Sequence, residues 1–258
     1  MEQTFVLSHG ELKIPIALTE PEDGDIRRLV MGVHGFGGCI RDDIQSSIAE
    51  EMDMFYAATV RFDFPGHGVS EMDDSYLTLK NCRDCLITVA KWIRSRYPDV
   101  EDLCIFATGF GAYITLTSLQ DLLELPGEVK LVVQTPTVML HKSILAMKNI
   151  SQATLWAMER VTFRADRPFD VTYSLYEEAR DNPAINTYPI PMLILQGEED
   201  SYIDKEDIQN FRRINEKSKL VIVPGVTHRF LEEGGWDMVL DLTRDWFAYE
   251  QVLLTDWI

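Results

Sequence analysis

The sequence has few basic residues, few cysteines and no long apolar run. Its 258 residues include 24 lysines and arginines against 42 aspartates and glutamates, a formal net charge of −18 at pH 7. A surface of that charge repels nucleic acid and anionic membranes, so we expect no nucleic-acid partner. No segment approaches the ~20 apolar residues of a spanning helix, and the first residues lack a secretory signal pattern. We therefore expect no membrane insertion and a cytoplasmic location.

The four cysteines are too few and too scattered for a disulfide framework or a metal site. Cys82 and Cys85 form a C-x-x-C pair, but they share helical spacing with apolar residues, which favours buried helix positions over a redox or metal role. Cys39 follows a glycine-rich turn, and nothing in the sequence places a base beside it. Histidines and carboxylates show no metal-type clustering either. We expect no metal and no organic cofactor.

Apolar strand patterns alternate with helical patterns along the chain. Such alternation predicts an α/β fold with a mostly parallel central sheet and helices on both faces, formed by one domain over residues 1–258. An antiparallel hairpin is expected to come first, turned at His9 and Gly10. The expected strands cover about residues 4–8, 12–18, 28–34, 57–63, 103–108, 130–135, 191–196 and 219–223, and the last helix about 235–249.

One connection is much longer than the rest. Over fifty residues separate the strand that ends near Pro136 from the strand that starts near Pro191, and they are rich in Met, Leu, Trp, Phe and Tyr. We expect a helical lid insertion over about residues 137–188, with Met139 and Trp156 as candidates to line a substrate pocket. The same apolar residues equally suit the ordinary core of a small helical subdomain.

A serine is missing where the surrounding residues favour one. The segment from Ala107 to Gly111, Ala-Thr-Gly-Phe-Gly, follows a buried strand and opens a helix, as does the nucleophile elbow G-x-S-x-G. The small residues that such a sharp turn needs are present. Gly109 stands at the nucleophile position, so the hydroxyl that attacks a carbonyl is absent.

The other parts of a hydrolytic site follow in the order nucleophile, acid, base. Asp200 ends a turn after an apolar strand, and His228 lies in a loop after the next one, which makes them candidates for the acid and the base. Upstream, a strand ends in a glycine-rich turn at residues 34–38. The backbone N–H groups of Phe36 in this turn and of Phe110 after the elbow are the candidate oxyanion-hole donors.

These motifs together resemble the α/β-hydrolase superfamily, and the resemblance covers nearly the whole chain. It is carried by His-Gly-Phe-Gly-Gly at 34–38, the segment 61–70, the elbow, Gly-Glu-Glu-Asp at 197–200 and Gly-Val-Thr-His at 225–228. Within that superfamily the chain is similar to small-lidded bacterial carboxylesterases related to cinnamoyl and feruloyl esterases and monoacylglycerol lipases. The resemblance implies a serine-hydrolase mechanism on a small-molecule ester with a short acyl or aromatic group. The departure at Gly109 concerns activity and leaves the expected fold unchanged.

Two hypotheses about function follow. In the first, the chain is an ester hydrolase whose serine has been replaced, by engineering or by recent loss, and which is inactive or very weak with Gly109. In the second, it is a natural non-catalytic member that binds a small acyl or aromatic ligand, or that uses only the Asp200–His228 pair. A dinucleotide-binding reading of the helix start fails, because Ile114 occupies the position that needs a small residue. Oligomeric state is left open.

Overall fold

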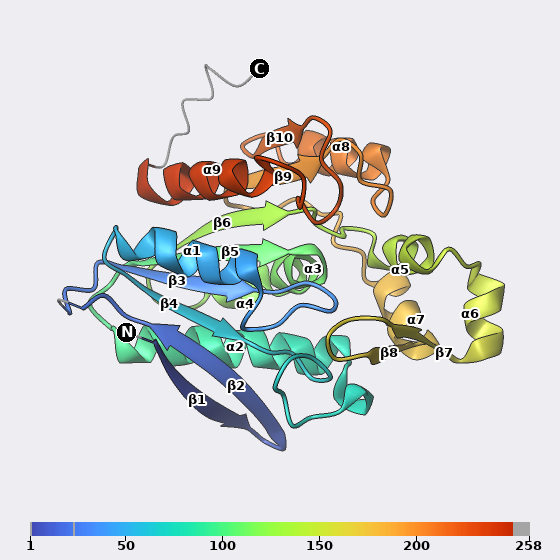
Figure 1. Cartoon of the computed structure of the whole chain (residues 1–258), viewed down its shortest axis with the longest axis horizontal. Coiled ribbons are helices and arrows are strands. Elements are labelled where there is room, and N and C mark those ends of the chain that lie inside the picture. The colour runs from blue at the N-terminus through green and yellow to red at the C-terminus, as the bar shows by residue number, and fades with distance from the viewer. Residues whose placement is uncertain (1, 23, 250–258) are drawn as a thin grey trace.

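An eight-stranded sheet forms the centre of the molecule, in the order β1-β2-β4-β3-β5-β6-β9-β10 (Figure 1). The computed structural model describes residues 2–22 and 24–249. The six strands β4, β3, β5, β6, β9 and β10 pair in parallel with their neighbours. Strands β1 and β2 form an antiparallel hairpin, and β2 joins the sheet by pairing antiparallel with β4. The strands of this sheet are β1 (Glu2–His9), β2 (Leu12–Thr19), β3 (Arg28–Val33), β4 (Ala57–Phe62), β5 (Asp102–Thr108), β6 (Glu128–Gln134), β9 (Met192–Gly197) and β10 (Lys219–Val223). The predicted α/β class is confirmed.

Helices cover both faces of the sheet because its inner strands are apolar on both sides. Along β5, Ile105 and Ala107 pack in a core with α2 and α3, whereas Cys104 and Phe106 pack against α1 and α9. Successive strand residues point to opposite faces, so a continuous apolar run buries both. These helices and their neighbours are α1 (Asp43–Asp53), α2 (Leu79–Arg96), α3 (Gly109–Thr117), α4 (Leu119–Leu123), α8 (Lys205–Ile214) and α9 (Gly235–Tyr249), with a short 3₁₀ helix η1 (Asp74–Tyr76).

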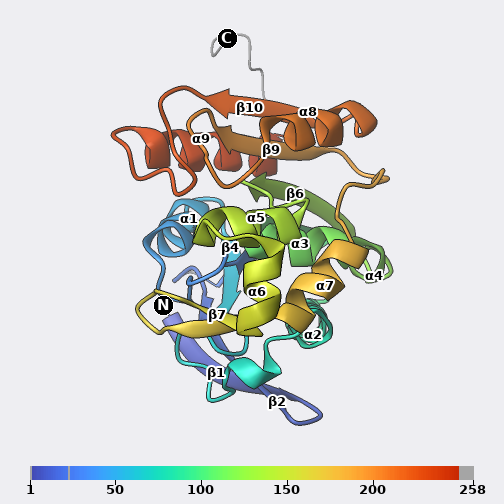
Figure 2. The same cartoon turned by 90° about the vertical axis from the view of Figure 1, so that its right-hand side faces the viewer.

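The long insertion between β6 and β9 lies beyond the ends of the strands, on the right in Figure 1 and toward the viewer in Figure 2. It contains helices as expected, and also an antiparallel hairpin that the sequence analysis did not predict. Its elements are α5 (Leu140–Lys148), α6 (Gln152–Met158), β7 (Arg160–Phe163), β8 (Phe169–Thr172) and α7 (Tyr173–Asp181). Strands of four residues are too short to give a clear period, and only their alternation of buried and outward residues marks them.

No helix in residues 2–22 and 24–249 combines the length and the apolar character needed to cross a bilayer.

Helix α3 passes very close to the end of β3. A Cβ on Gly111 would lie 2.4 Å from the carbonyl oxygen of His34 and 2.6 Å from that of Val33. Both are backbone atoms that cannot turn aside. The absence of a side chain at residue 111 therefore lets α3 lie directly behind the strand that ends in the glycine-rich turn.

We expect Gly111→Ala to destabilise the protein by roughly 3 kcal/mol, since overpacking against fixed backbone costs about this much. Thermal melting should show a fall of about 6–12 °C at this chain length. The control is Gly225→Ala, where φ is +68° but nothing lies within 4 Å of the added Cβ, so that only backbone strain of about 1 kcal/mol applies. Equal melting temperatures for the two variants would contradict the close approach of α3 to β3.

Candidate active site

Gly109 forms the junction between β5 and α3. Thr108 has an extended backbone, Gly109 has a φ of +47°, and the helix begins at once. A Cβ on Gly109 would lie 3.6 Å from His228 Nε2 and 3.9 Å from Gly35 Cα, which are ordinary contact distances. From the loop after β6, the Thr137 hydroxyl donates a hydrogen bond to the Gly109 carbonyl over 3.0 Å. The junction thus directs any side chain at residue 109 toward His228.

Asp200 and His228 come together from the ends of neighbouring strands. Asp200 follows β9, His228 follows β10, and the two strands pair in parallel. The His228 Nδ1 lies 2.8 Å from Asp200 Oδ2. Since a carboxylate only accepts, Nδ1 carries the hydrogen, and Nε2 is left as the nitrogen that faces residue 109.

Three donors hold the Asp200 carboxylate, whose side chain is 1% exposed. Besides His228, Gln196 Nε2 donates to Oδ2 over 2.9 Å, and the Tyr202 N–H donates to Oδ1 over 2.8 Å. Burial alone would raise the pKa of this carboxyl, but the hydrogen bonds and the charge interaction with His228 outweigh it and hold the pKa below its usual value. The Tyr202 ring also lies edge-on to the imidazole, with centroids 5.2 Å apart. Asp200 is therefore a fixed anion behind His228.

The two candidate oxyanion donors lie in and next to the elbow. Phe110 is the second residue of α3, and the first N–H groups of a helix have no acceptor within it. Phe36 lies in a turn closed by a 3.1 Å hydrogen bond from the Gly38 N–H to the Gly35 carbonyl. Within the described residues, neither Phe36 nor Phe110 has a protein acceptor for its N–H. Their rings stack with centroids 4.2 Å apart, which keeps the two backbone segments together.

Buried side chains fix the shape of that turn. His34 accepts a hydrogen bond at Nε2 from the Phe64 N–H, and its Nδ1 donates to the Gly35 carbonyl over 2.8 Å. Burial lowers the pKa of His34 to about 4, so the ring is neutral. Asp63 accepts from the Ile40 N–H over 2.6 Å and from the Val69 N–H over 2.7 Å. These two side chains thus organise the loops around the turn.

Aromatic rings from the lid pack against the ring of Phe36. The Phe163 and Phe169 rings, from β7 and β8, lie 5.5 Å and 5.6 Å from the Phe36 ring between centroids. These two residues were not among the sequence candidates, because the hairpin that carries them was not predicted. Of the two lid candidates, Met139 is half-buried at the start of α5, whereas Trp156 is 66% exposed on α6.

The burial of the cysteines favours a structural role over a catalytic one. Cys82 and Cys85 are buried on α2, where burial raises the pKa of both thiols, that of Cys85 to about 12. Cys39 is half-buried, and its Sγ lies 3.7 Å from a carboxylate oxygen of Asp42. Burial raises the pKa of this thiol to about 11, so it is not a ready nucleophile. No group of His, Cys, Asp and Glu among residues 2–22 and 24–249 is placed to hold a metal ion.

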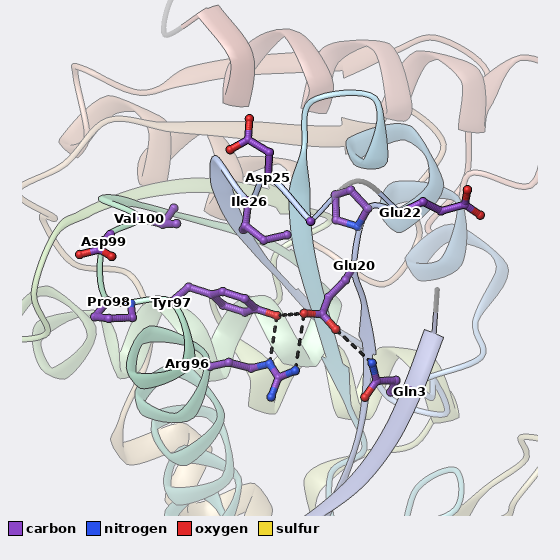
Figure 3. Close-up of a pocket in the computed structure, with 12 residues that line it drawn as sticks. Gln3, Glu20, Glu22, Asp25, Ile26, Arg96, Tyr97, Pro98, Asp99 and Val100 are labelled. Atoms are coloured by element: carbon purple, nitrogen blue, oxygen red, sulfur yellow. Dashed lines mark hydrogen bonds and ion pairs between the residues drawn. The ribbon is translucent and has the colours of Figure 1, made fainter.

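A separate hollow lies at the opposite, amino end of the parallel strands, between the end of α2 and the end of β2 (Figure 3). Its polar side chains bond to one another: Gln3 donates to Glu20 over 3.2 Å, while the Tyr97 hydroxyl and the Arg96 guanidinium also contact that carboxylate. This arrangement connects α2 to the edge of the sheet and provides no catalytic pair.

No known protein family model matches the chain, and no curated protein matches it in sequence. Solved structures do match it. A putative hydrolase from Agrobacterium vitis has a TM-score of 0.78 at 17% identity, over 95% of this chain and 97% of that one. Est1E from Butyrivibrio proteoclasticus with bound ferulic acid has a TM-score of 0.76 at 18% identity, over 94% of this chain and 97% of that one. A soluble variant of Saccharomyces cerevisiae monoglyceride lipase, in complex with a substrate analogue, has a TM-score of 0.77 at 14% identity, over 98% of this chain and 96% of that one. The chain has the α/β-hydrolase fold.

We expect Gly109→Ser to lower the stability of the protein slightly. The added Cβ meets no close atom, so the cost is the strain of a positive φ in a non-glycine residue, roughly 1–3 kcal/mol. Loss of glycine's freedom in the unfolded chain offsets about 0.4–1 kcal/mol. A net loss of about 1 kcal/mol should lower the melting temperature by about 2–4 °C. Gly10→Ser, in the β1–β2 turn with a φ of +57° and nothing within 4 Å of an added Cβ, is the matched control for strain away from the site. A Gly109→Ser protein that melts at or above the parent contradicts the strained elbow.

Asp63 should produce a measurable pH dependence of stability. Burial, which outweighs the two N–H bonds and the charge of Arg167, raises the pKa of this carboxyl to about 6. Between about pH 4 and pH 6 the folded chain keeps a proton that the unfolded chain releases. The stability from this group is thus fully present below about pH 4 and is lost as the pH rises through 6.

Urea denaturation of the parent and of Asp63→Asn across this range tests the point. The free energy of unfolding of the parent, minus that of the variant, should fall as the pH rises from about 4 to 6 and stay level above about 7. A difference that is constant or that rises with pH would refute it.

Proposed function

We propose that this chain carries the site of a carboxylic ester hydrolase from which the nucleophile is missing, and that its ligands are esters of short acyl or aromatic acids. One observation carries the proposal. The Cβ direction at Gly109 leads to within 3.6 Å of His228 Nε2, and the other nitrogen of that ring bonds to Asp200. A serine at this position would complete a Ser-His-Asp triad.

The geometry supports a defined mechanism for the serine form. The serine hydroxyl would attack the ester carbonyl while His228 Nε2 takes its proton and Asp200 stabilises the resulting imidazolium. The Phe36 and Phe110 N–H groups would bind the oxyanion. Water activated by the same His228 would then hydrolyse the acyl-enzyme. With Gly109 no acyl-enzyme forms on residue 109, and turnover should be lower by roughly 10⁶.

The lining of the site supports an aromatic or short acyl group. Phe36 is half-buried next to the candidate oxyanion donors, and the buried rings of Phe163 and Phe169 pack behind it. A flat aromatic or short apolar group packs well against such a ring. Two structural relatives agree with this class. Est1E binds ferulic acid, and the yeast monoglyceride lipase variant binds a substrate analogue. We propose esters of hydroxycinnamate-like or short aliphatic acids as the ligands to test first.

We expect Gly109→Ser to gain esterase activity on p-nitrophenyl acetate and p-nitrophenyl butyrate, by several orders of magnitude in kcat/KM, because it restores the attacking group. The double variant Gly109→Ser with His228→Ala is the matched control and should lose nearly all of that gain, by roughly 10³-fold or more. Circular dichroism confirms that each protein is folded. A folded Gly109→Ser protein that is as inert as the double variant would exclude an esterase site.

A further inference from the structure

We propose that the chain as it stands is a weak hydrolase of activated acyl compounds, namely aryl esters and thioesters, in which the Asp200–His228 pair drives direct attack by water. This inference rests on the site proposed above, but it needs no serine and no covalent intermediate. The observations that carry it are the space beside Gly109, the orientation of His228 and the two unpaired N–H groups.

The first observation is that glycine leaves room for a water molecule next to the imidazole. The nearest atoms to a Cβ built on Gly109 are His228 Nε2 at 3.6 Å and Gly35 Cα at 3.9 Å. A side chain's first atom therefore fits there without displacing anything. A water oxygen in that region, moved slightly toward the ring, would lie within hydrogen-bonding distance of Nε2. It would stand where a serine hydroxyl stands in the triad.

The second observation is that Nε2 is prepared to accept a proton from that water. In an uncharged imidazole whose Nδ1 donates to Asp200, the lone pair lies on Nε2, which is the nitrogen that faces residue 109. The Asp200 carboxylate is buried, held by Gln196 and Tyr202, and remains charged. It therefore stabilises the imidazolium that forms when the water loses its proton.

The third observation is that the N–H groups that would bind the oxyanion do not depend on a side chain at residue 109. The Phe36 and Phe110 N–H groups have no protein acceptor among the described residues. Phe110 follows Gly109 in the chain, and Phe36 follows Gly35, whose Cα lies 3.9 Å from a Cβ built on Gly109. A carbonyl oxygen bound between them would place its carbon next to the water. Preorganised backbone donors of this kind are each worth about 10²–10³ in rate.

The chemical step is balanced with water as the only other reactant. The water oxygen bonds to the acyl carbon, its proton passes to His228 Nε2, and the carbonyl electron pair moves to the oxygen held by Phe36 and Phe110. When the oxyanion collapses, the bond to the leaving group breaks. The proton on Nε2 then passes to the departing phenolate or thiolate. The products are a carboxylic acid and a phenol or thiol.

The substrate class follows from the strength of the nucleophile. Water activated by a general base gains typically 10²–10⁴-fold in rate, which is far less than a complete triad provides. Such a modest gain produces measurable turnover only where the leaving group departs easily. Phenolates and thiolates do so, whereas the alkoxides of alkyl esters and the amines of amides do not.

The test compares the parent with His228→Ala, Asp200→Asn and Gly109→Ala on p-nitrophenyl acetate and on S-phenyl thioacetate. We expect kcat/KM of the parent to exceed that of His228→Ala by roughly 10²-fold. Asp200→Asn should also lose most of this activity, since the amide no longer stabilises the imidazolium. The parent reaction should be slower in D₂O, because the proton moves in the rate-limiting step.

Gly109→Ala separates water attack from attack by the imidazole itself. Its methyl group takes the place of the water at an ordinary contact distance from Nε2 and leaves His228 and Asp200 unchanged. We expect at least a tenfold loss of the parent activity in this variant. Thermal melting shows whether this variant is folded. If it is unfolded, the loss of activity in Asp200→Asn and the slower parent reaction in D₂O test the inference in its place.

Two outcomes overturn the inference: a parent no more active than His228→Ala, or a folded Gly109→Ala protein as active as the parent. Both can occur while Gly109→Ser gains full esterase activity, in which case the proposed function stands and this inference fails. Conversely, a parent that shows the expected pattern beside an inert Gly109→Ser protein would support water attack and remove the serine-type site.

Discussion

Parallel strand pairing is the constraint on which this site depends. Because β3, β5, β9 and β10 run in the same direction, their carboxyl ends meet at one edge of the sheet. Each loop at that edge contributes one part: the turn with Phe36, the elbow at Gly109, the carboxylate of Asp200 and the imidazole of His228. Groups that are distant in the sequence therefore lie within a few ångströms of one another.

The absence of a side chain at residue 109 leaves the remaining parts in place, because none of them is held by that residue. Asp200 is held by Gln196 and the Tyr202 N–H, and His228 is held by Asp200. The turn that carries Phe36 is fixed by buried hydrogen bonds of His34. The Asp200–His228 pair and the turn with Phe36 therefore keep their arrangement although residue 109 has no side chain.

The lid packs against the turn that carries Phe36 through its two-stranded hairpin. Phe163 and Phe169 pack against Phe36, so the lid and the turn that carries Phe36 share one aromatic cluster. The helical part of the lid is placed differently: Trp156 on α6 is largely exposed, and Met139 is half-buried at the start of α5.

The sequence by itself determined the α/β class, the positions of the strands along the chain, and Gly109, Asp200 and His228 as candidate site residues, because apolar runs, turn glycines and their succession along the chain are local signals. The order of the strands within the sheet came from the structure. Only the tertiary structure decided that the Nδ1 of His228 bonds to Asp200, that Nε2 faces residue 109, and that Gln196 and Thr137 support the site. It also revealed the β7–β8 hairpin, whose strands of four residues give little periodic signal. Contacts between distant segments depend on strand pairing and loop packing, which no local pattern encodes.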